Sequence, residues 1–122
     1  MEFNSTSRLP LFQQVAEQIE EAILNGSFKE NAQIPSTTEI SKAFQINPAT
    51  ILKGMNILVE QNVLVKQRGI GMFVVDGAQA QLQQQRSQQF LSTNLVQFIK
   101  EAQQLNITAT QLITLIERGY ER

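Results

Sequence analysis

The chain has 122 residues and a formal net charge of −1 at pH 7, and it contains no cysteine and no histidine. This composition excludes disulfides, thiolate zinc sites and cysteine nucleophiles, and it removes the commonest general base and metal ligand. The length predicts one domain with at most a small appendage, and the lack of a signal peptide or long apolar run predicts a soluble cytoplasmic protein.

The first predicted helix begins after Pro10 and ends near Asn25 and Gly26, a pair that favours a left-handed C-terminus. Residues 1–9 are polar and are expected to be flexible, and residues 27–33 are expected to form a connecting loop. Apolar residues recur at helical spacing on one face of this helix, at Phe12, Val15, Ala16, Ile19, Ala22 and Ile23.

Residues 34–53 predict two capped helices joined by a tight turn. Ser36 and Glu39 are spaced as a capping box, in which each satisfies a backbone N–H of the other. Asn47 followed by Pro48 is a second start signal, because a capping side chain precedes a ring that fixes φ. The short spacing between the helices makes them cross steeply, which is the helix-turn-helix pattern.

The second of these helices is expected to continue to about Gln61. Gly54 weakens it by roughly 1 kcal/mol relative to Ala. Gly54 marks either close packing against another helix or a tolerated defect. The expected apolar positions are Ile40, Ala43 and Phe44 on the first helix, and Ile51, Met55, Leu58 and Val59 on the second.

Residues 63–66 and 72–75 predict two short strands that form a hairpin. Gly69 and Gly71 lie in its turn, where positive φ is needed. A phosphate-binding loop is a poorer interpretation, because the third glycine, the following helix and the lysine are missing. Three helices followed by a hairpin predict a winged helix-turn-helix, with the hairpin as the wing.

Asp76 and Gly77 divide the predicted winged helix-turn-helix domain, residues 1–76, from a helical tail, residues 77–122. The tail begins with a glutamine-rich stretch that predicts helix, because glutamine is a good helix former. A frayed polar linker over residues 78–88 is the alternative.

The tail carries an apolar stripe that is too small to form a core of its own. Thr108 and Gln111 form another capping box, which starts a last short helix. The stripe is expected to pack against a second chain in a two-fold homodimer, or alternatively to fold back on the first helix of its own chain. The expected dimerisation residues are Leu91, Leu95, Phe98, Ile99, Ala102, Leu112 and Ile116.

The helix that starts at Asn47 is expected to enter the major groove of DNA. Asn47, Ala49, Thr50 and Lys53 lie at its start or opposite its apolar face, although each is also an ordinary surface residue. Asparagine and lysine can donate to base edges or phosphates, and the alanine methyl can contact a thymine methyl.

Two further groups are expected near the DNA backbone. Ser36, Thr37 and Thr38 open the preceding helix, whose N-terminal N–H groups favour a phosphate, and Ser36 can act as a cap as well. Arg68 and Gly69 form the tip of the wing, where Arg68 either contacts the minor groove or a phosphate, or is an ordinary exposed turn residue.

Charge is distributed unevenly along the chain. Residues 1–30 carry −3, residues 31–75 carry +2 and residues 76–122 carry 0. The positive excess lies in residues 31–75, which include the helix expected to enter the major groove, but it is small for a DNA-binding domain. The contribution of phosphate contacts to the binding free energy of one subunit should therefore be modest, and a dimer would double it.

The chain resembles the GntR family of bacterial transcription regulators over about residues 9–75. The resemblance is carried by four stretches in the family's order, residues 10–16, 34–36, 46–51 and 68–74. The short helical tail is similar to that of the YtrA subfamily, whose two C-terminal helices serve dimerisation. The resemblance implies a mainly α fold with a small β-hairpin, and a homodimer that binds a pseudo-palindromic operator and usually represses.

Family contact positions are matched here by Ser36, Asn47, Thr50, Lys53 and Gly69. Thr38 and Leu52 stand where the family commonly has arginines, which predicts weaker guanine readout and lower affinity. Gln45 replaces the usual glycine of the turn, where positive φ would cost on the order of 1 kcal/mol.

The expected function is therefore sequence-specific DNA binding in transcription regulation, with no cofactor and no metal. The alternative is a winged-helix module that binds another protein and not DNA. An enzyme is the least supported class, because the sequence offers no histidine, no cysteine and no evident acid pair. A small-molecule effector could bind between the tail and the winged helix-turn-helix domain, although no residue indicates such a site.

Overall fold

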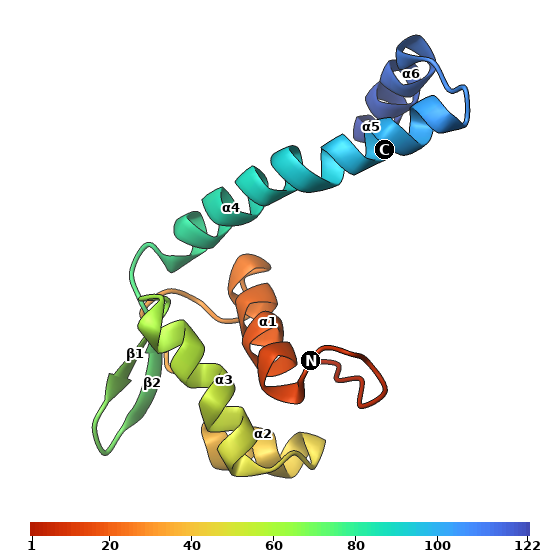
Figure 1. Ribbon diagram of the computed structural model, residues 1–122. Coiled ribbons are helices and arrows are strands. Elements are labelled where there is room, and N and C mark those ends of the chain that lie inside the picture. The colour runs from red at the N-terminus through yellow and green to blue at the C-terminus, as the bar shows by residue number, and fades with distance from the viewer. The chain divides into compact units, whose positions relative to one another are not determined.

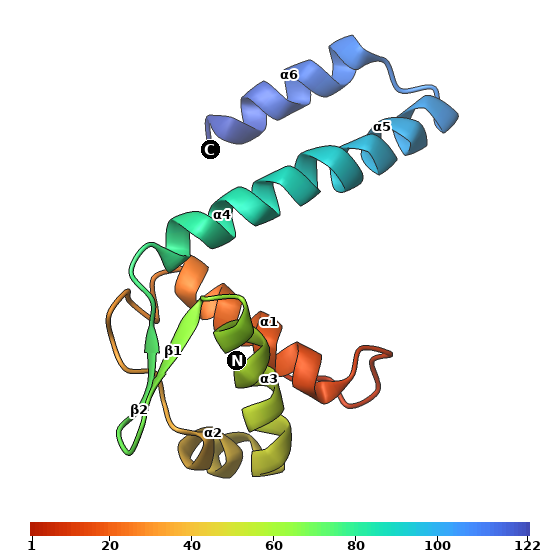
Figure 2. The ribbon, with the colours of Figure 1, turned by 60° about the vertical axis from the view of Figure 1, so that its left-hand side comes forward.

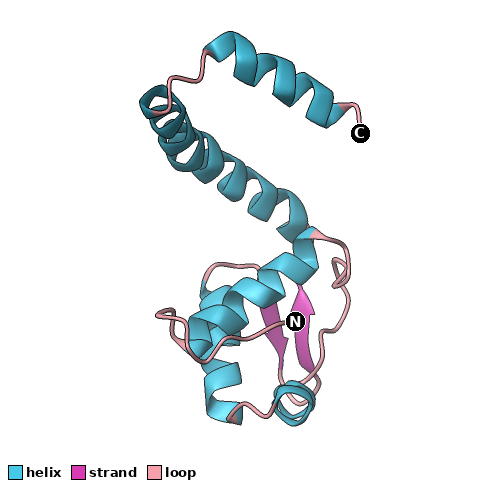
Figure 3. Cartoon of the chain, turned by 90° about the vertical axis from the view of Figure 1, so that its right-hand side faces the viewer, coloured by secondary structure: helices cyan, strands magenta, loops and turns pink.

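The computed structural model describes residues Met1–Arg122, which divide into two compact units, Met1–Gln83 and Gln84–Arg122. The fold is mainly helical with one antiparallel hairpin, as predicted (Figures 1 and 3). None of its helices is long and apolar enough to span a membrane. The elements are α1 (Leu11–Leu24), α2 (Thr37–Phe44), α3 (Pro48–Glu60), β1 (Leu64–Gln67), β2 (Gly71–Val74), α4 (Ala78–Gln89), the π-helical segment η1 (Phe90–Asn94), α5 (Leu95–Gln104) and α6 (Ala109–Tyr120).

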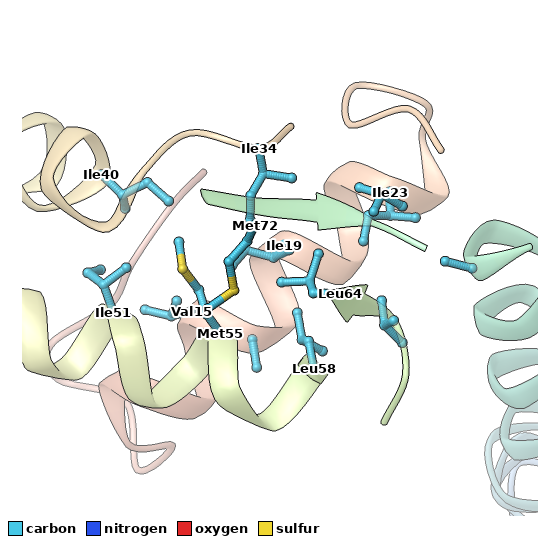
Figure 4. Close-up of a cluster of buried hydrophobic side chains, with 14 of the residues drawn as sticks. Val15, Ile19, Ile23, Ile34, Ile40, Ile51, Met55, Leu58, Leu64 and Met72 are labelled. Atoms are coloured by element: carbon cyan, nitrogen blue, oxygen red, sulfur yellow. The ribbon is translucent and has the colours of Figure 1, made fainter. Parts of the chain in front are cut away.

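The first unit has a single apolar core, to which α1, α3 and the hairpin contribute most (Figure 4). The helical spacing predicted for α1 and α3 is confirmed, because their apolar positions face each other in this core. Its largest fully buried side chains are Val15, Ile19, Ile23, Ile51, Met55, Leu58, Val63, Leu64, Val74 and Leu82.

Gly54 lies where α1 and α3 are in closest contact. A Cβ at this position would lie 2.6 Å from the backbone oxygen of Phe12 and 2.8 Å from Cβ of Val15. The structure therefore supports the close-packing explanation for Gly54 over a tolerated defect: the two backbones approach so closely that only a residue without a side chain fits.

Both predicted helix starts of the helix-turn-helix are confirmed (Figure 2). The Ser36 hydroxyl accepts from Glu39 N at 3.0 Å, and a Glu39 carboxylate oxygen accepts from Ser36 N at 3.2 Å. Asn47 Oδ1 accepts from Ala49 N at 2.8 Å. Gln45 adopts φ 54° and ψ 45°, so the left-handed turn residue is a non-glycine here.

Residues 1–9, which the sequence predicts to be flexible, form an arm that is hydrogen-bonded to α1 in the structure. Gln14, which is 8% exposed, accepts from Asn4 N at 2.8 Å and donates to the carbonyls of Asn4 and Leu9 at 2.9 and 2.8 Å. A buried amide must satisfy its polar groups, and the arm supplies the partners. Phe3 also packs edge-on against Phe44, with ring centroids 5.1 Å apart.

The apolar side expected for α2 is only partly confirmed. Ile40 is buried, whereas Ala43 and Phe44 are exposed. The helix has 8 residues, and Ile40 is its only side chain in the core. Phe44 instead contacts the N-terminal arm through Phe3.

The hairpin strands lie within one residue of their predicted positions, with Leu64 opposite Val74 and Gln67 opposite Gly71. Residues 27–33 are more than a loop, because the end of this segment pairs with the second edge of β2. Val74 N donates to Ala32 O at 3.0 Å, and its carbonyl accepts from Asn31 N at 2.8 Å.

Glu30 joins that same segment to the start of α4. Its two carboxylate oxygens accept from Gly77 N at 3.0 Å and Gln79 N at 3.2 Å. The first turns of α4 are therefore part of the first unit, in whose core Ala78 and Leu82 are fully buried. The helical prediction for this stretch is confirmed, and a frayed linker is not what the structure shows.

Replacing Glu30 with alanine is expected to lower the free energy of unfolding by about 1 kcal/mol, because it leaves N-terminal N–H groups of α4 without a partner. Urea denaturation at fixed protein concentration measures this loss. Glu17→Ala removes the same charge from an exposed position in α1 and is expected to change stability by less than about 0.5 kcal/mol. Equal stability of the two variants would contradict the capping role.

The second unit consists of helices with very little buried surface. The capping box at the start of α6 is confirmed by Thr108 and Gln111. The π-helical segment η1 has no counterpart in the sequence prediction. Of the predicted dimerisation residues, Ala102 is buried and Leu95 and Leu112 are half-buried, whereas four are exposed, namely Leu91, Phe98, Ile99 and Ile116.

Candidate nucleic-acid interface

The outward side of α3 carries most of the residues predicted to read DNA. Asn47, Ala49 and Lys53 are exposed, and Thr50 is half-buried. The opposite side of the helix is anchored in the core by Ile51, Met55 and Leu58. The structure therefore brings the four predicted positions together on the first turns of one helix that is held rigidly from behind.

Lys53 has a contact that the sequence did not indicate. Its Nζ lies 3.9 Å from the centroid of the Phe12 ring, which belongs to α1. The sequence pattern places Phe12 only on the apolar face of the first helix, and helical periodicity cannot show that its ring reaches a lysine on another helix. Gly54 was the available clue, since it marks where α1 and α3 touch.

The three residues that open α2 are not equivalent. The Ser36 hydroxyl is engaged in the capping box. Thr37 is half-buried and donates to Sδ of Met55 at 3.6 Å, so its hydroxyl points into the domain. Thr38 is exposed. The structure thus leaves the Thr38 side chain accessible and turns that of Thr37 away from solvent.

The wing tip presents Arg68 and Gly69 in an exposed turn, closed by a hydrogen bond from Ile70 N to Gln67 O at 3.0 Å. Gly69 has φ 77°, as the turn prediction requires. The Ile70 side chain is 62% exposed beside them, a residue that the sequence interpretation did not single out.

Gln33 supports the wing from the adjoining segment and was also missed. Its Nε2 donates to the carbonyl of Ile70 at 2.9 Å. At Gly71, where φ is 148°, a Cβ would lie 2.5 Å from that same Nε2. Glycine at this position therefore allows the amide to approach the backbone and hold the wing tip.

The net positive charge of residues 31–75 lies at the surface of the first unit. All four cations of residues 31–75 are exposed, namely Lys42, Lys53, Lys66 and Arg68. Leu52, which stands where an arginine was expected, is 38% exposed on α3. The surface can accept phosphates, with fewer groups for bidentate guanine contacts than an arginine-bearing helix would have.

Comparison with protein families decides the assignment. Residues 11–74 match the profile of the bacterial regulatory proteins of the gntR family. The chain belongs to the GntR family. It thus has the fold of a DNA-binding transcription regulator from a family that is generally non-enzymatic.

Solved GntR-family structures resemble the chain over most of its length. A transcriptional regulator of the GntR family from Bacteroides thetaiotaomicron is 28% identical, with a TM-score of 0.75 and coverage of 93% of this chain and 98% of that one. YtrA from Sulfolobus acidocaldarius, a GntR-family transcription factor, is 24% identical with a TM-score of 0.56, over 99% of this chain and 97% of its own.

The AraR DNA-binding domain, solved in complex with operator ORR3, is 32% identical with a TM-score of 0.55, and covers 62% of this chain and 90% of its own. A comparison with curated protein sequences gives no match.

Proposed function

We propose that this protein is a YtrA-like GntR-family repressor, which binds a pseudo-palindromic DNA operator in the cytoplasm as a homodimer. The observation that carries the proposal is the exposed polar side of α3, which is anchored from behind by the core and accompanied by exposed cations. The similarity to the AraR DNA-binding domain, solved in complex with an operator, supports DNA binding by the first unit.

In the proposed complex, α3 enters the major groove. Asn47, Ala49 and Thr50 lie at its start, where they can meet base edges. The N–H groups at the start of α2, together with Ser36 and Thr38, suit a phosphate. Thr37 would contribute through its backbone, because its hydroxyl is turned toward Met55.

Arg68 and Gly69 complete the proposed surface at the wing. Arg68 can reach a phosphate or the minor groove from an exposed turn, and Gly69 lets the backbone approach the DNA closely. Gln33 keeps that turn in place through Ile70. We assign residues 1–76 to DNA binding on this basis.

We assign the predicted tail, residues 77–122, to dimerisation, with the first turns of α4 anchored in the core of the first unit. Eleven large apolar side chains between Phe90 and Tyr120 are exposed, and a monomer rarely leaves so many apolar groups in water. A two-fold dimer would cover them and hold two copies of α3 at a fixed separation, which suits two half-sites of a palindrome. The full-length similarity to YtrA supports the subfamily proposal.

Selection from a library of random duplexes, followed by titration, tests this function. The selected sequence is expected to have two-fold symmetry. If two exposed cations of each subunit contact phosphates, the dimer makes four such contacts. Its affinity for DNA should then fall roughly 100-fold between about 50 and about 200 mM salt, because each contact releases a counterion. A scrambled duplex should bind more weakly with a similar salt dependence.

The protein-binding alternative predicts a different result. Without phosphate contacts, no sequence would be enriched and no duplex would be retained, even in low salt. That outcome would overturn the proposed function.

A further inference from the structure

We infer that Phe12 is a positioning residue for Lys53: its ring holds the ammonium group at the edge of α3, where it contacts a DNA phosphate and not a base edge. This inference rests on the proposed function. It assigns a role in DNA binding to a residue of α1, outside the helix-turn-helix and the wing.

The first observation is the geometry of the pair. Nζ of Lys53 lies 3.9 Å from the centroid of the Phe12 ring, well within the range in which the negative face of an aromatic ring attracts a cation. Lys53 is exposed and Phe12 is half-buried, so the ring covers one side of the ammonium and leaves the other side open to solvent. The remaining N–H donors are free to meet an anion.

The second observation is that helix packing fixes the position of the ring. Gly54, the neighbour of Lys53, admits the backbone of Phe12 so closely that a Cβ would lie 2.6 Å from its oxygen. Val15, one turn further along α1, is fully buried against the same glycine. The ring therefore belongs to a rigid contact, and the flexible lysine adapts to it.

This arrangement favours a phosphate over a base. Lys53 follows Ala49 by one helical turn on the outward side of α3, so a lysine that reached base edges from here would have to extend straight outward. An ammonium bound to a ring of α1 lies instead beside α3, on the side of the neighbouring helix, where a groove-bound helix meets the DNA backbone. The lysine ammonium acts as a point charge, which suits a phosphate. Because the Phe12 ring already orders the Lys53 side chain in the free protein, less side-chain entropy is lost when the complex forms.

A double-mutant cycle with Phe12→Leu and Lys53→Ala tests the inference on the full chain, with the selected duplex and a random duplex as probes. Lys53→Ala is expected to weaken binding to both probes equally, and to lower the salt slope by about 0.9 per subunit. Phe12→Leu, which keeps an apolar side chain without a ring face, is expected to weaken binding roughly two- to five-fold. This loss should vanish in the Lys53→Ala background, and Phe12→Tyr should restore binding.

Resonances of the free protein give a second readout that needs no DNA. The ε-methylene protons of Lys53 should be shifted upfield by the ring of Phe12 and should return toward ordinary values in Phe12→Leu. Circular dichroism shows whether each variant is folded. If Phe12→Leu does not fold, Phe12→Tyr and Lys53→Met are compared with the unmodified protein instead, by the ring-current shift for Phe12→Tyr and by the salt slope of DNA binding for Lys53→Met.

Equal losses from Phe12→Leu with and without Lys53 would overturn the inference, because they would indicate a purely structural role. So would a Lys53→Ala variant that relaxes the preference at one base position and leaves binding to random duplex unchanged. Failure of the unmodified protein to bind either duplex would instead overturn the proposed function, so the two failures are distinguishable.

Discussion

Gly54→Val is expected to destabilise the first unit by about 3 kcal/mol or more. Even the first added carbon would lie 2.6 Å from the Phe12 oxygen and 2.8 Å from Cβ of Val15. Because Val15 is fully buried and the oxygen belongs to the backbone of α1, neither atom can move without separating the two helices. The gain in helix propensity over glycine is well under 1 kcal/mol and cannot compensate.

Urea denaturation followed by circular dichroism measures this loss, and Gly119→Val is the matched control. Gly119 also lies within a helix, α6, but a Cβ there meets nothing within 4 Å. Its replacement is expected to change stability by less than about 0.5 kcal/mol. Similar stabilities for the two variants would show that α1 and α3 do not pack as closely as described.

The double variant Leu95→Asp and Ile99→Asp is expected to convert the proposed dimer into monomers. Leu95 is half-buried and Ile99 is 43% exposed on α5, one helical turn apart, so both would face the second chain. Each carboxylate would lose its water in an apolar interface without a partner, at a cost of several kcal/mol. Operator affinity should fall at least roughly 100-fold, because a monomer holds only one half-site.

Sedimentation velocity measures the oligomeric state. Thr93→Asp with Gln97→Asp is the control, since it adds the same two charges at exposed positions on the other side of the helical tail. This control is expected to sediment as a dimer and to bind the operator normally. A Leu95→Asp and Ile99→Asp protein that still dimerises would remove the tail from the interface.

The features that the sequence predicts well depend on residues close together in the chain. The capping boxes at Ser36 and Thr108 and the cap at Asn47 each involve only neighbouring residues, and all three occur as predicted. The amphipathic pattern of α1 likewise reports its own buried face. Such signals are local, because the partner groups are only two or three positions away.

The features that were missed depend on contacts between distant parts of the chain. Gln14 looks like one of several polar residues of α1, yet it is buried because residues 4–9 return to it. Gln33 and Phe12 act on Ile70 and Lys53, which are 37 and 41 positions away. Periodicity describes one element at a time, so it cannot identify these pairs.

The hairpin also has a consequence for how the protein behaves at high concentration. Residues Asn31 to Ile34 pair with the outer edge of β2 through three backbone hydrogen bonds, so little of that edge is open to another molecule. β1 is limited to four residues and carries Lys66, and a short, charged edge discourages the addition of foreign strands. The folded domain therefore provides a poor template for amyloid-type aggregation.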